Sequence, residues 1–271
     1  MKFTDQSSFF DYIKSLRYIA SKELGQNFLI NPLIAQAIVN ALDVQSEDNV
    51  LEIGAGFGSL SYFLASHQGL VNLLDVDPKP LLFLKEQFGD KANVSFTQES
   101  ILKHDLARYQ RIIGNLPYYI TNSTIEHVLL NARSAKKLVF MVQKEVLSRL
   151  IASVGDEGYG PLSILISYLG TPKRLINVKR QDFCPPPHVD SVVLSIDLNE
   201  NINYEMASQL FAFAKALFHH RRKTVKNNLR ILLKNSENAN SVLNLLAIDG
   251  DKRPQDLDLK SYLALTKQLK F

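Results

Sequence analysis

The sequence is poor in the residues that build disulfides, metal clusters and membrane spans. Its 271 residues include one cysteine, Cys184, which excludes an internal disulfide and a zinc site made of several cysteines. The six histidines show no metal-ligand spacing, so we predict no metal. No apolar run approaches the ~18 residues of a membrane span, and the N-terminus lacks the pattern of a signal or transit peptide. We therefore expect a monomer of the reducing cytoplasm, without membrane contact.

Excess charge of one sign is also missing from most of the chain. Residues 1–204 carry 19 basic and 21 acidic side chains, whereas residues 205–271 carry 12 basic and 6 acidic ones. The net charges are therefore −2 and +6. Such a distribution indicates either a polyanionic partner bound by the C-terminal part or a basic helical bundle that is simply solvated.

The chain does contain segments in which apolar residues recur at strand spacing, alternating with segments in which they recur at helix spacing. Strands are predicted at 49–53, 70–75, 93–97, 110–114 and 136–142, and helices at 31–42, 59–67, 78–88, 121–131, 143–152 and 161–169. This order is typical of an α/β fold, with a mostly parallel sheet covered on both faces. Residues 172–180 and 190–197 are expected to close the sheet edge as an antiparallel pair.

The strand pattern stops before Tyr204, and only helical spacing follows. Helices are predicted at 205–219, 223–234, 239–247 and 258–269. We predict a catalytic domain over residues 1–200 and a small all-helical domain over 201–271, joined near 197–203. Residues 1–30 form an extension of the first domain, in which residues 7–20 have the spacing of an amphipathic helix.

A glycine-rich turn follows the first long strand. Residues 52–58 read Glu-Ile-Gly-Ala-Gly-Phe-Gly, and the next strand ends at Asp75, 21 positions after Gly54. Glycines allow a tight turn and a close approach by a ligand, and an acid at this distance is placed to bind ribose hydroxyls. The third glycine comes one residue too early for the dinucleotide fingerprint, which favours a nucleoside cofactor without pyrophosphate, such as S-adenosylmethionine. A plain strand-to-helix turn is the alternative.

The tetrapeptide Asn115-Leu116-Pro117-Tyr118 follows another strand, at the edge where open α/β sheets bind ligands. The Asn115 carboxamide and the Leu116 carbonyl are hydrogen-bond acceptors, Pro117 stiffens the turn, and Tyr118 offers a flat ring. Two acceptors beside an aromatic ring suit the exocyclic amine of a planar base. The alternative is a structural loop with a half-buried tyrosine.

Two later segments also carry possible functions. Residues 183–188, Phe-Cys-Pro-Pro-Pro-His, predict a stiff extended loop that either connects two edge strands or serves the site. Residues 218–230 contain five Lys and Arg, two His and two Asn, which predicts a phosphate-binding patch at the start of a helix. A solvated helix face is the alternative for this second segment.

Taken together in this order, the motifs closely resemble the KsgA-type ribosomal RNA adenine dimethyltransferases. The resemblance covers nearly the whole chain. It includes residues 24–29 (Leu-Gly-Gln-Asn-Phe-Leu), 52–56, 115–119, 143–146, 159–163, 183–187 and 221–229. It implies a Rossmann-like methyltransferase domain that uses S-adenosylmethionine. It further implies that two adjacent adenosines of the 3′-terminal hairpin of small-subunit ribosomal RNA become N6,N6-dimethyladenosine in an immature small subunit.

The resemblance also implies roles for individual residues. The cofactor would be held by Asn27, Leu29, Gly54, Asp75, Glu99 and Asn115; the reaction would be carried by Asn115, Leu116, Pro117 and Tyr118; the target base would stack between Tyr118 and Phe183; and RNA would be bound by Arg221, Arg222, Lys223 and Lys226. Two positions depart from the family. Asp75 stands where Glu is commoner, and Glu99, in Gln98-Glu99-Ser100, stands where the family usually has the aspartate that contacts the adenine amine of the cofactor, so that it keeps the charge on a longer side chain.

Two other functions share parts of this pattern. One is a drug-resistance methyltransferase acting on large-subunit ribosomal RNA, against which the stretch from Arg221 to Leu229 and the proline-rich loop both argue. The other is a non-catalytic nucleic-acid-binding factor derived from the same fold, against which the intact glycine turn and tetrapeptide argue.

Overall fold

The computed structural model describes residues 11, 15, 18, 20–21 and 24–271, so the predicted helix at 7–20 falls largely outside the described residues. The chain divides into two compact units. The first comprises residues 1–147 and 173–198, and the second comprises residues 148–172 and 199–271. No helix among the described residues is long and apolar enough to cross a membrane.

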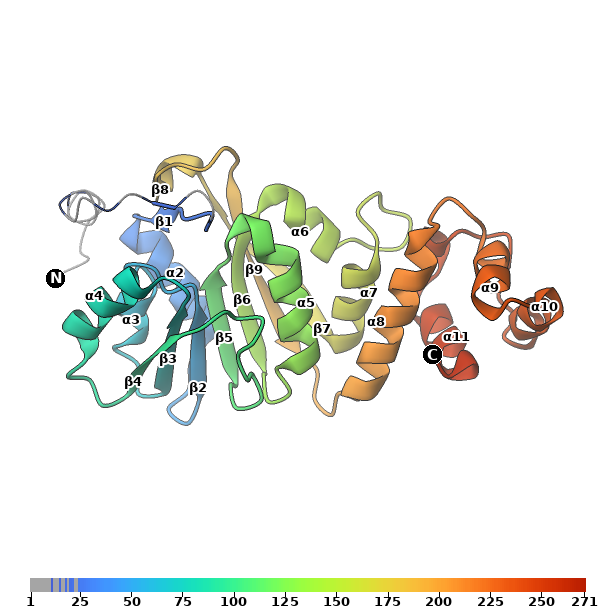
Figure 1. Ribbon diagram of the computed structural model, residues 1–271, viewed down its shortest axis with the longest axis horizontal. Helices are drawn as coiled ribbons and strands as arrows, with labels where there is room; N and C mark the ends of the chain where they lie inside the picture. Colours follow the sequence, from blue (N-terminus) through green and yellow to red (C-terminus); the bar gives the residue numbers. More distant parts are fainter. Residues whose placement is uncertain (1–10, 12–14, 16–17, 19, 22–23) are drawn as a thin grey trace. The chain divides into compact units, whose positions relative to one another are not determined.

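The first unit is built on a sheet of seven strands in the order β4-β3-β2-β5-β6-β9-β7 (Figure 1). The strands are β2 (Asn49–Ile53), β3 (Leu70–Asp75), β4 (Val94–Gln98), β5 (Arg111–Asn115), β6 (Lys137–Gln143), β7 (Gly170–Val178) and β9 (Ser191–Leu198). Neighbours from β4 to β6 pair in parallel, and β9 pairs antiparallel with β6. The predicted strands are confirmed, each within about two residues at either end.

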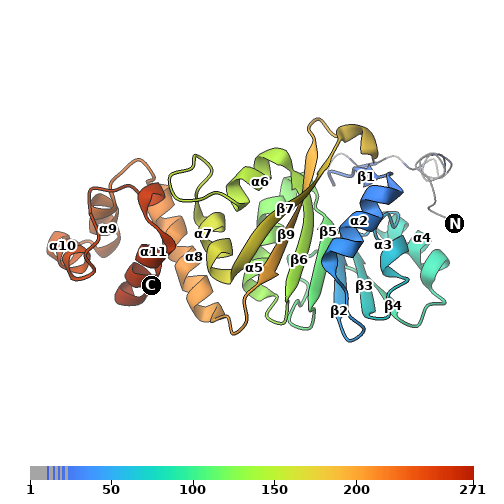
Figure 2. The same cartoon turned by 180° about the vertical axis from the view of Figure 1, so that it is seen from behind.

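Helices lie on both faces of this sheet. They are α2 (Pro32–Leu42), α3 (Ser61–Leu64), α4 (Pro78–Phe88), α5 (Thr121–Asn131) and α6 (Lys144–Leu150). Figures 1 and 2 show α5 in front of the strands from one side and α2 in front of them from the other. The α2 helix begins as predicted, because Asn31 accepts hydrogen bonds from the backbone of Leu33 and Ile34 before Pro32.

A two-stranded pairing near the carboxyl ends of the strands was not predicted. β1 (Phe28–Leu29) pairs antiparallel with β8 (Phe183–Cys184), although both segments were expected to be loops. Each strand has only two residues, too few to show a strand period in the sequence. The pairing ties the N-terminal segment to the proline-rich loop, about 155 residues later in the chain.

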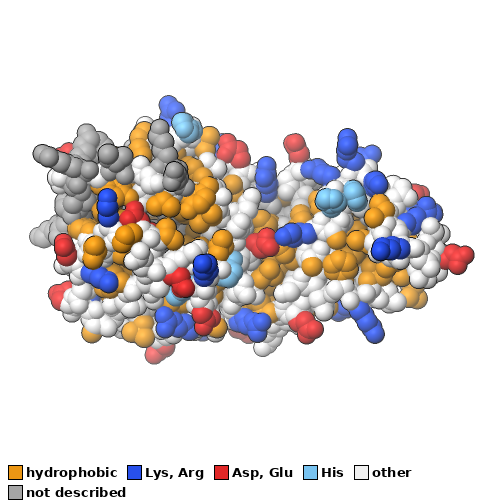
Figure 3. All heavy atoms as spheres, viewed as in Figure 1, with side chains coloured by type: hydrophobic (Ala, Val, Ile, Leu, Met, Phe, Trp, Pro, Cys, Tyr) orange, Lys and Arg blue, Asp and Glu red, His pale blue; other side chains and the backbone are white. Residues whose placement is uncertain are grey.

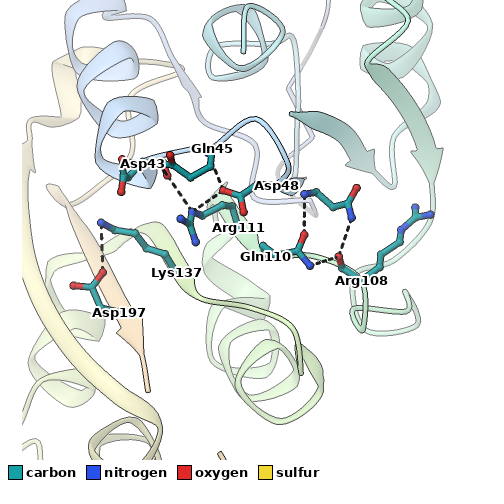
Figure 4. Close-up of polar contacts among 9 residues, drawn as sticks. Asp43, Gln45, Asp48, Arg108, Gln110, Arg111, Lys137 and Asp197 are labelled. Carbon is teal, nitrogen blue, oxygen red and sulfur yellow. Dashed lines mark hydrogen bonds and ion pairs between the residues drawn. The ribbon is translucent and has the colours of Figure 1, made fainter. Parts of the chain in front are cut away.

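Polar contacts connect the strands at the end of the sheet where β2 and β5 begin, opposite their carboxyl ends (Figure 4). Arg111, at the start of β5, pairs with the buried Asp48 at 3.2 Å and donates to the Asp43 carbonyl at 3.2 Å. Gln110 accepts from the Asn49 backbone at 2.9 Å. These contacts join the starts of β2 and β5, so the carboxyl ends of both strands remain free to carry the site.

The second unit is helical. It contains α7 (Pro161–Leu169), α8 (Tyr204–His219), α9 (Val225–Leu233), α10 (Ser236–Leu245) and α11 (Leu259–Leu269). Its core includes the buried side chains of Ile164, Phe213 and Tyr262. The boundary predicted at residue 200 differs from this division at residues 148–172, which belong to the second unit, where α7 packs against α8.

Candidate active site

A pocket of about 270 Å³ opens at the carboxyl ends of β2, β3 and β5. It is lined by three segments predicted from the sequence, namely the glycine-rich turn, the end of β3 and the Asn-Leu-Pro-Tyr tetrapeptide. The lining residues are 24–29, 52–56, 59–60, 74–76, 100–102 and 115–120. The tertiary structure thus brings together residues that are separated by up to 96 positions in the sequence, from Leu24 to Ile120.

The glycine-rich turn is fixed by hydrogen bonds to the neighbouring strand. The amides of Gly54 and Ala55 donate to the Leu74 carbonyl at 2.8 and 3.1 Å. Gly54 and Gly56 have φ angles of 69° and 51°, a region that side chains disfavour. A Cβ atom on Gly56 would lie 3.1 Å from the ring of Phe28, so the N-terminal segment also needs glycine at this position.

Asp75 joins the turn to the end of β3. Its carboxylate accepts from the amides of Gly56 and Asp77, both at 2.9 Å, and the residue is buried. Burial raises the pKa of Asp75, whereas the two amides lower it. Each of these amides occupies only part of the acceptor capacity of the carboxylate, so Asp75 can still accept from a ligand in the pocket.

Glu52 is a pocket residue to which the sequence analysis gave no role. It is fully buried at the end of β2, and its carboxyl group accepts from the Ser61 hydroxyl at 2.6 Å. Burial, with a smaller contribution from the nearby Asp75, raises the pKa of Glu52 to about 8, although the hydrogen bond from Ser61 opposes this shift. The side chain is thus mostly protonated at neutral pH. The position of this acid, two residues before the first glycine of the turn, was the feature of the sequence that could have indicated a role in the site.

Asn115 is oriented by a hydrogen bond from its amide nitrogen. Its Nδ2 donates to the Asn27 carbonyl at 2.9 Å, and no described residue donates to its Oδ1. The adjacent Leu116 is buried, and its amide donates to the Met141 carbonyl at 3.1 Å. The Leu116 carbonyl likewise accepts from no described residue. Two free acceptors therefore lie next to each other in the pocket lining.

The tetrapeptide continues into a rigid turn. Pro117 has a φ angle of −58°, and its carbonyl accepts from the Ile120 amide at 3.2 Å and from the Thr121 hydroxyl at 2.8 Å. Tyr118 is half-buried and its hydroxyl lies 3.2 Å from the Ser191 hydroxyl. Burial raises the pKa of Tyr118, and the hydrogen bond to Ser191 opposes this shift. The ring is therefore neutral and fixed at both ends.

The N-terminal segment forms another wall of the pocket. Asn27 offers the carbonyl that holds Asn115, and Leu29 offers the carbonyl that accepts from the Ser59 hydroxyl at 2.6 Å. Both residues line the pocket. Gln26 secures this wall, since its Nε2 donates to Asp77 at 3.0 Å and the Tyr18 hydroxyl lies 2.7 Å from its Oε1.

Two predicted site residues lie elsewhere. Glu99 is outside the pocket lining and pairs with His104 at 2.8 Å, and the next residue, Ser100, lines the pocket instead. Phe183 is also outside the lining, and its ring, only 3% exposed, belongs to the apolar core of the first unit. Successive side chains after a strand point in different directions, so Ser100 can face the pocket while the Glu99 carboxylate turns to His104.

Apolar residues that the sequence analysis passed over complete the pocket. Val76 follows β3, and Ile101 and Leu102 follow β4. Val76 and Leu102 are 42% and 41% exposed, so their side chains offer apolar surface to a ligand. These apolar walls suit one face of a planar heterocycle, since pockets for such ligands combine apolar surfaces with few polar contacts. The described residues contain no cluster that could hold a metal ion.

The predicted basic patch lies in the second unit, in the turn between α8 and α9 (Figure 3). Arg221, Arg222 and Lys223 are exposed and form no ion pair with a described residue, and Lys226 is partly exposed. The buried side chain of Asn228 stabilises this turn. Its Nδ2 donates to the carbonyls of His220, Lys223 and Thr224 at 3.1 to 3.3 Å. Its side chain was missed because asparagine within a helix is usually exposed.

The same combination of sites occurs in known proteins. The family model for ribosomal RNA adenine dimethylase matches residues 19–270. The chain belongs to the ribosomal RNA adenine dimethylase family. Its enzymes are S-adenosylmethionine-dependent methyltransferases, and the resemblance noted from the sequence is confirmed.

Individual relatives agree with this assignment. The ribosomal RNA small subunit methyltransferase A of Alkaliphilus metalliredigens is 33% identical over 270 residues, which cover 95% of this chain and 94% of that protein. The protein of the same name from Levilactobacillus brevis is 36% identical over 266 residues, covering 92% and 90%. Among solved structures, a dimethyladenosine transferase from Plasmodium falciparum has a TM-score of 0.76 and 26% identity, covering 89% of this chain and 96% of that chain.

The 23S ribosomal RNA methyltransferase ErmE is also similar, with a TM-score of 0.68 and 20% identity over 90% of this chain and the whole of that chain. This likeness shows the shared fold alone. The curated relatives named above therefore decide between the two kinds of ribosomal RNA methyltransferase considered from the sequence, and they favour the small-subunit enzymes.

Proposed function

We propose that this enzyme transfers methyl groups from S-adenosylmethionine to the N6 atoms of two adjacent adenosines in the 3′-terminal hairpin of small-subunit ribosomal RNA. It acts as a cytoplasmic monomer on an immature small subunit. The observation that carries the proposal is the pair of free acceptors, Asn115 Oδ1 and the Leu116 carbonyl, in a pocket that also contains an acid at the end of β3.

The residues of the pocket fit the cofactor. Asp75 is available for the two ribose hydroxyls, and Val76, Ile101 and Leu102 offer apolar surface for the adenine ring. Gly54 lets the backbone pass close to the methionine part, and Asn27 and Leu29 form part of the wall. When bound, the cofactor supplies a methyl group on a positively charged sulfur.

Asn115 and Leu116 prepare the nucleophile. The lone pair of an adenine amine is delocalised into the ring, so the amine is a weak nucleophile. Two acceptors that bind its two hydrogens favour a more tetrahedral nitrogen and aim the lone pair away from the ring. Because Asn115 is already fixed by the Asn27 carbonyl, its oxygen needs no reorientation, which is positioning combined with electrostatic stabilisation. No strong base is needed, since the proton leaves after transfer.

Tyr118 provides the surface on which the target base rests. The base must leave its stack in the RNA to reach the pocket, and stacking on an aromatic ring offsets part of that cost. The hydrogen-bonded contact with Ser191 holds the tyrosine ring in place before the base arrives. The exposed cations at 221–223, together with Lys226, bind RNA phosphates and account for the basic balance of the helical unit.

The proposal is tested by mass spectrometry of ribosomal RNA from cells that lack this protein. Small-subunit RNA should lose both dimethyladenosines, and a plasmid copy of the wild-type chain should restore them, whereas an Asn115→Ala copy should not. Primer extension on the large-subunit RNA serves as the control. Unchanged small-subunit RNA, or a mark lost from large-subunit RNA instead, would contradict the proposal.

A further inference from the structure

Two successive tyrosines in the tetrapeptide turn lie in different surroundings. Tyr118 is half-buried and its hydroxyl lies near Ser191, as described above. Tyr119 is 56% exposed, lines the same pocket, and its hydroxyl forms no hydrogen bond with a described residue. A mostly exposed aromatic ring at a pocket rim offers a flat apolar face that a bound ligand can cover.

The position of the Tyr119 ring is nevertheless fixed by its neighbours. It belongs to the short helix η1 (Tyr118–Ile120), which is held by the two hydrogen bonds to the Pro117 carbonyl. Its Cδ1 lies 3.3 Å from where a Cβ atom on Gly25 would be, so the ring rests against the backbone of Gly25. Gly25 has a φ angle of 58° and tolerates this approach because it has no side chain.

We infer that Tyr119 is a second stacking surface, for the nucleobase next to the adenosine that enters the pocket. The inference rests on the proposed function and deepens it. Tyr119 directly follows the residues that receive the target amine, so the base beside the target is the part of the substrate that reaches this rim. Unpaired bases stack on exposed aromatic rings with little regard to sequence. The proposed substrate has an adenosine at the neighbouring position, and purines offer the larger stacking surface.

A stacking role and a packing role make different demands on the side chain. If Tyr119 only supports the N-terminal wall at Gly25, any bulky apolar side chain can replace it, and leucine should work as well as phenylalanine. If it stacks on a base, a planar ring is needed, and phenylalanine should work where leucine fails. The Tyr119 hydroxyl has no hydrogen-bond partner among the described residues, so its removal in Tyr119→Phe should have little effect on activity whether the ring packs or stacks.

The test uses the full-length enzyme and small ribosomal subunits whose RNA lacks the two dimethyladenosines. Methyl transfer is measured at saturating S-adenosylmethionine for the wild type and for Tyr119→Phe, Tyr119→Leu and Tyr119→Ala, and the KM for subunits is separated from kcat. Calorimetric titration gives the affinity for S-adenosylmethionine. Leu33→Ala, a truncation at a residue of α2 that is 76% exposed and outside the pocket lining, is the matched control.

We expect the Leu and Ala variants to lose about 5- to 100-fold in kcat/KM, mainly through KM, which corresponds to the loss of one base–aromatic stack. The Phe variant should stay close to the wild type, and all variants should keep their affinity for S-adenosylmethionine. A Leu variant as active as the Phe variant, or a fall in cofactor affinity that accounts for the lost activity, would overturn the inference and leave the proposed function standing. Absence of transfer by the wild type would overturn both.

Discussion

The two units of the molecule hold their functional side chains in opposite physical states. In the sheet unit, Glu52 and Asp75 are buried and hydrogen-bonded, and burial raises the pKa of both. In the helical unit, Arg221, Arg222 and Lys223 are exposed and form no ion pair with a described residue. The first arrangement positions a small ligand by short, directed contacts. The second attracts a polyanion at a distance, with little demand on geometry.

This contrast separates two kinds of sensitivity. A preorganised contact in a buried pocket has a large effect on rate and responds little to salt. Exposed cations contribute to binding through the release of counterions, so their effect depends on ionic strength. The comparison can be tested by replacing pocket residues and exposed cations separately. Pocket variants should change the rate or the cofactor affinity, and cation variants should change the salt dependence of RNA binding.

The largest effect is expected for Asn115→Ala. The wild-type amide is held by the Asn27 carbonyl and offers Oδ1 to the amine, and loss of one such contact in the transition state typically costs ~10²–10³ in rate. Single-turnover transfer to undermethylated small subunits should fall by this amount, while cofactor binding stays measurable. Asn131→Ala, in an exposed part of α5, is the control. Near wild-type turnover of the Asn115 variant would refute the assigned mechanism.

A smaller effect is expected for Asp75→Ala, and on affinity rather than rate. A hydrogen bond to a charged group is worth about 1.5–3 kcal/mol, so S-adenosylmethionine should bind about 10- to 100-fold more weakly by calorimetric titration. Turnover at saturating cofactor should fall less. Because the carboxylate also holds the Gly56 and Asp77 amides, the melting temperature should fall as well. An unchanged dissociation constant would mean that Asp75 serves the fold alone.

The helical unit is tested by replacing Arg221, Arg222 and Lys223 together with Ala. If three phosphate contacts are lost, the slope of log affinity for the small subunit against log salt should flatten by roughly two to three units. Cofactor affinity should stay unchanged. Replacement of Lys260, Lys267 and Lys270, which are exposed on and just after α11, removes the same charge elsewhere and should change the slope less. A lower melting temperature with an unchanged slope would point to a packing role.

The last prediction concerns the pH dependence of stability, which only the buried acids of the sheet unit should control. Glu52 has a pKa of about 8 in the folded protein, against an ordinary value of 4.5. Between these values the native state keeps a proton that the unfolded state releases, so the free energy of unfolding should fall as pH rises from 4.5 to about 8.

Glu52→Gln keeps an acceptor for Ser61 and removes the titration. Its free energy of unfolding in urea should therefore depend less on pH, by up to about 1.4 kcal/mol per pH unit within this window. Glu47→Gln, at an exposed position, should match the wild type. A wild-type slope retained in the Glu52 variant would show that other groups control the pH dependence.

Much of the candidate site could be located from the sequence because the patterns that indicate it are local. Apolar periodicity indicates the strand β2, and glycines that tolerate a tight turn indicate the turn after it. Adjacent acceptor groups indicate the function of the tetrapeptide from Asn115 to Tyr118. The general rule that parallel strands end at one edge then places Gly54, Asp75 and Asn115 together, and the pocket lining contains all three.

Other features depended on residues that are remote in sequence. The position of Ser100 rather than Glu99 in the pocket, the burial of Phe183 and the neutral state of Glu52 all follow from which side chains surround them in three dimensions. The exposure of the Tyr119 ring and its contact with Gly25 likewise depend on how these segments pack together. By itself, the sequence determined the elements, their order and the chemical groups at the strand ends. Only the tertiary structure decided which groups face the pocket, which are desolvated and which remain exposed, because these properties depend on packing between distant segments.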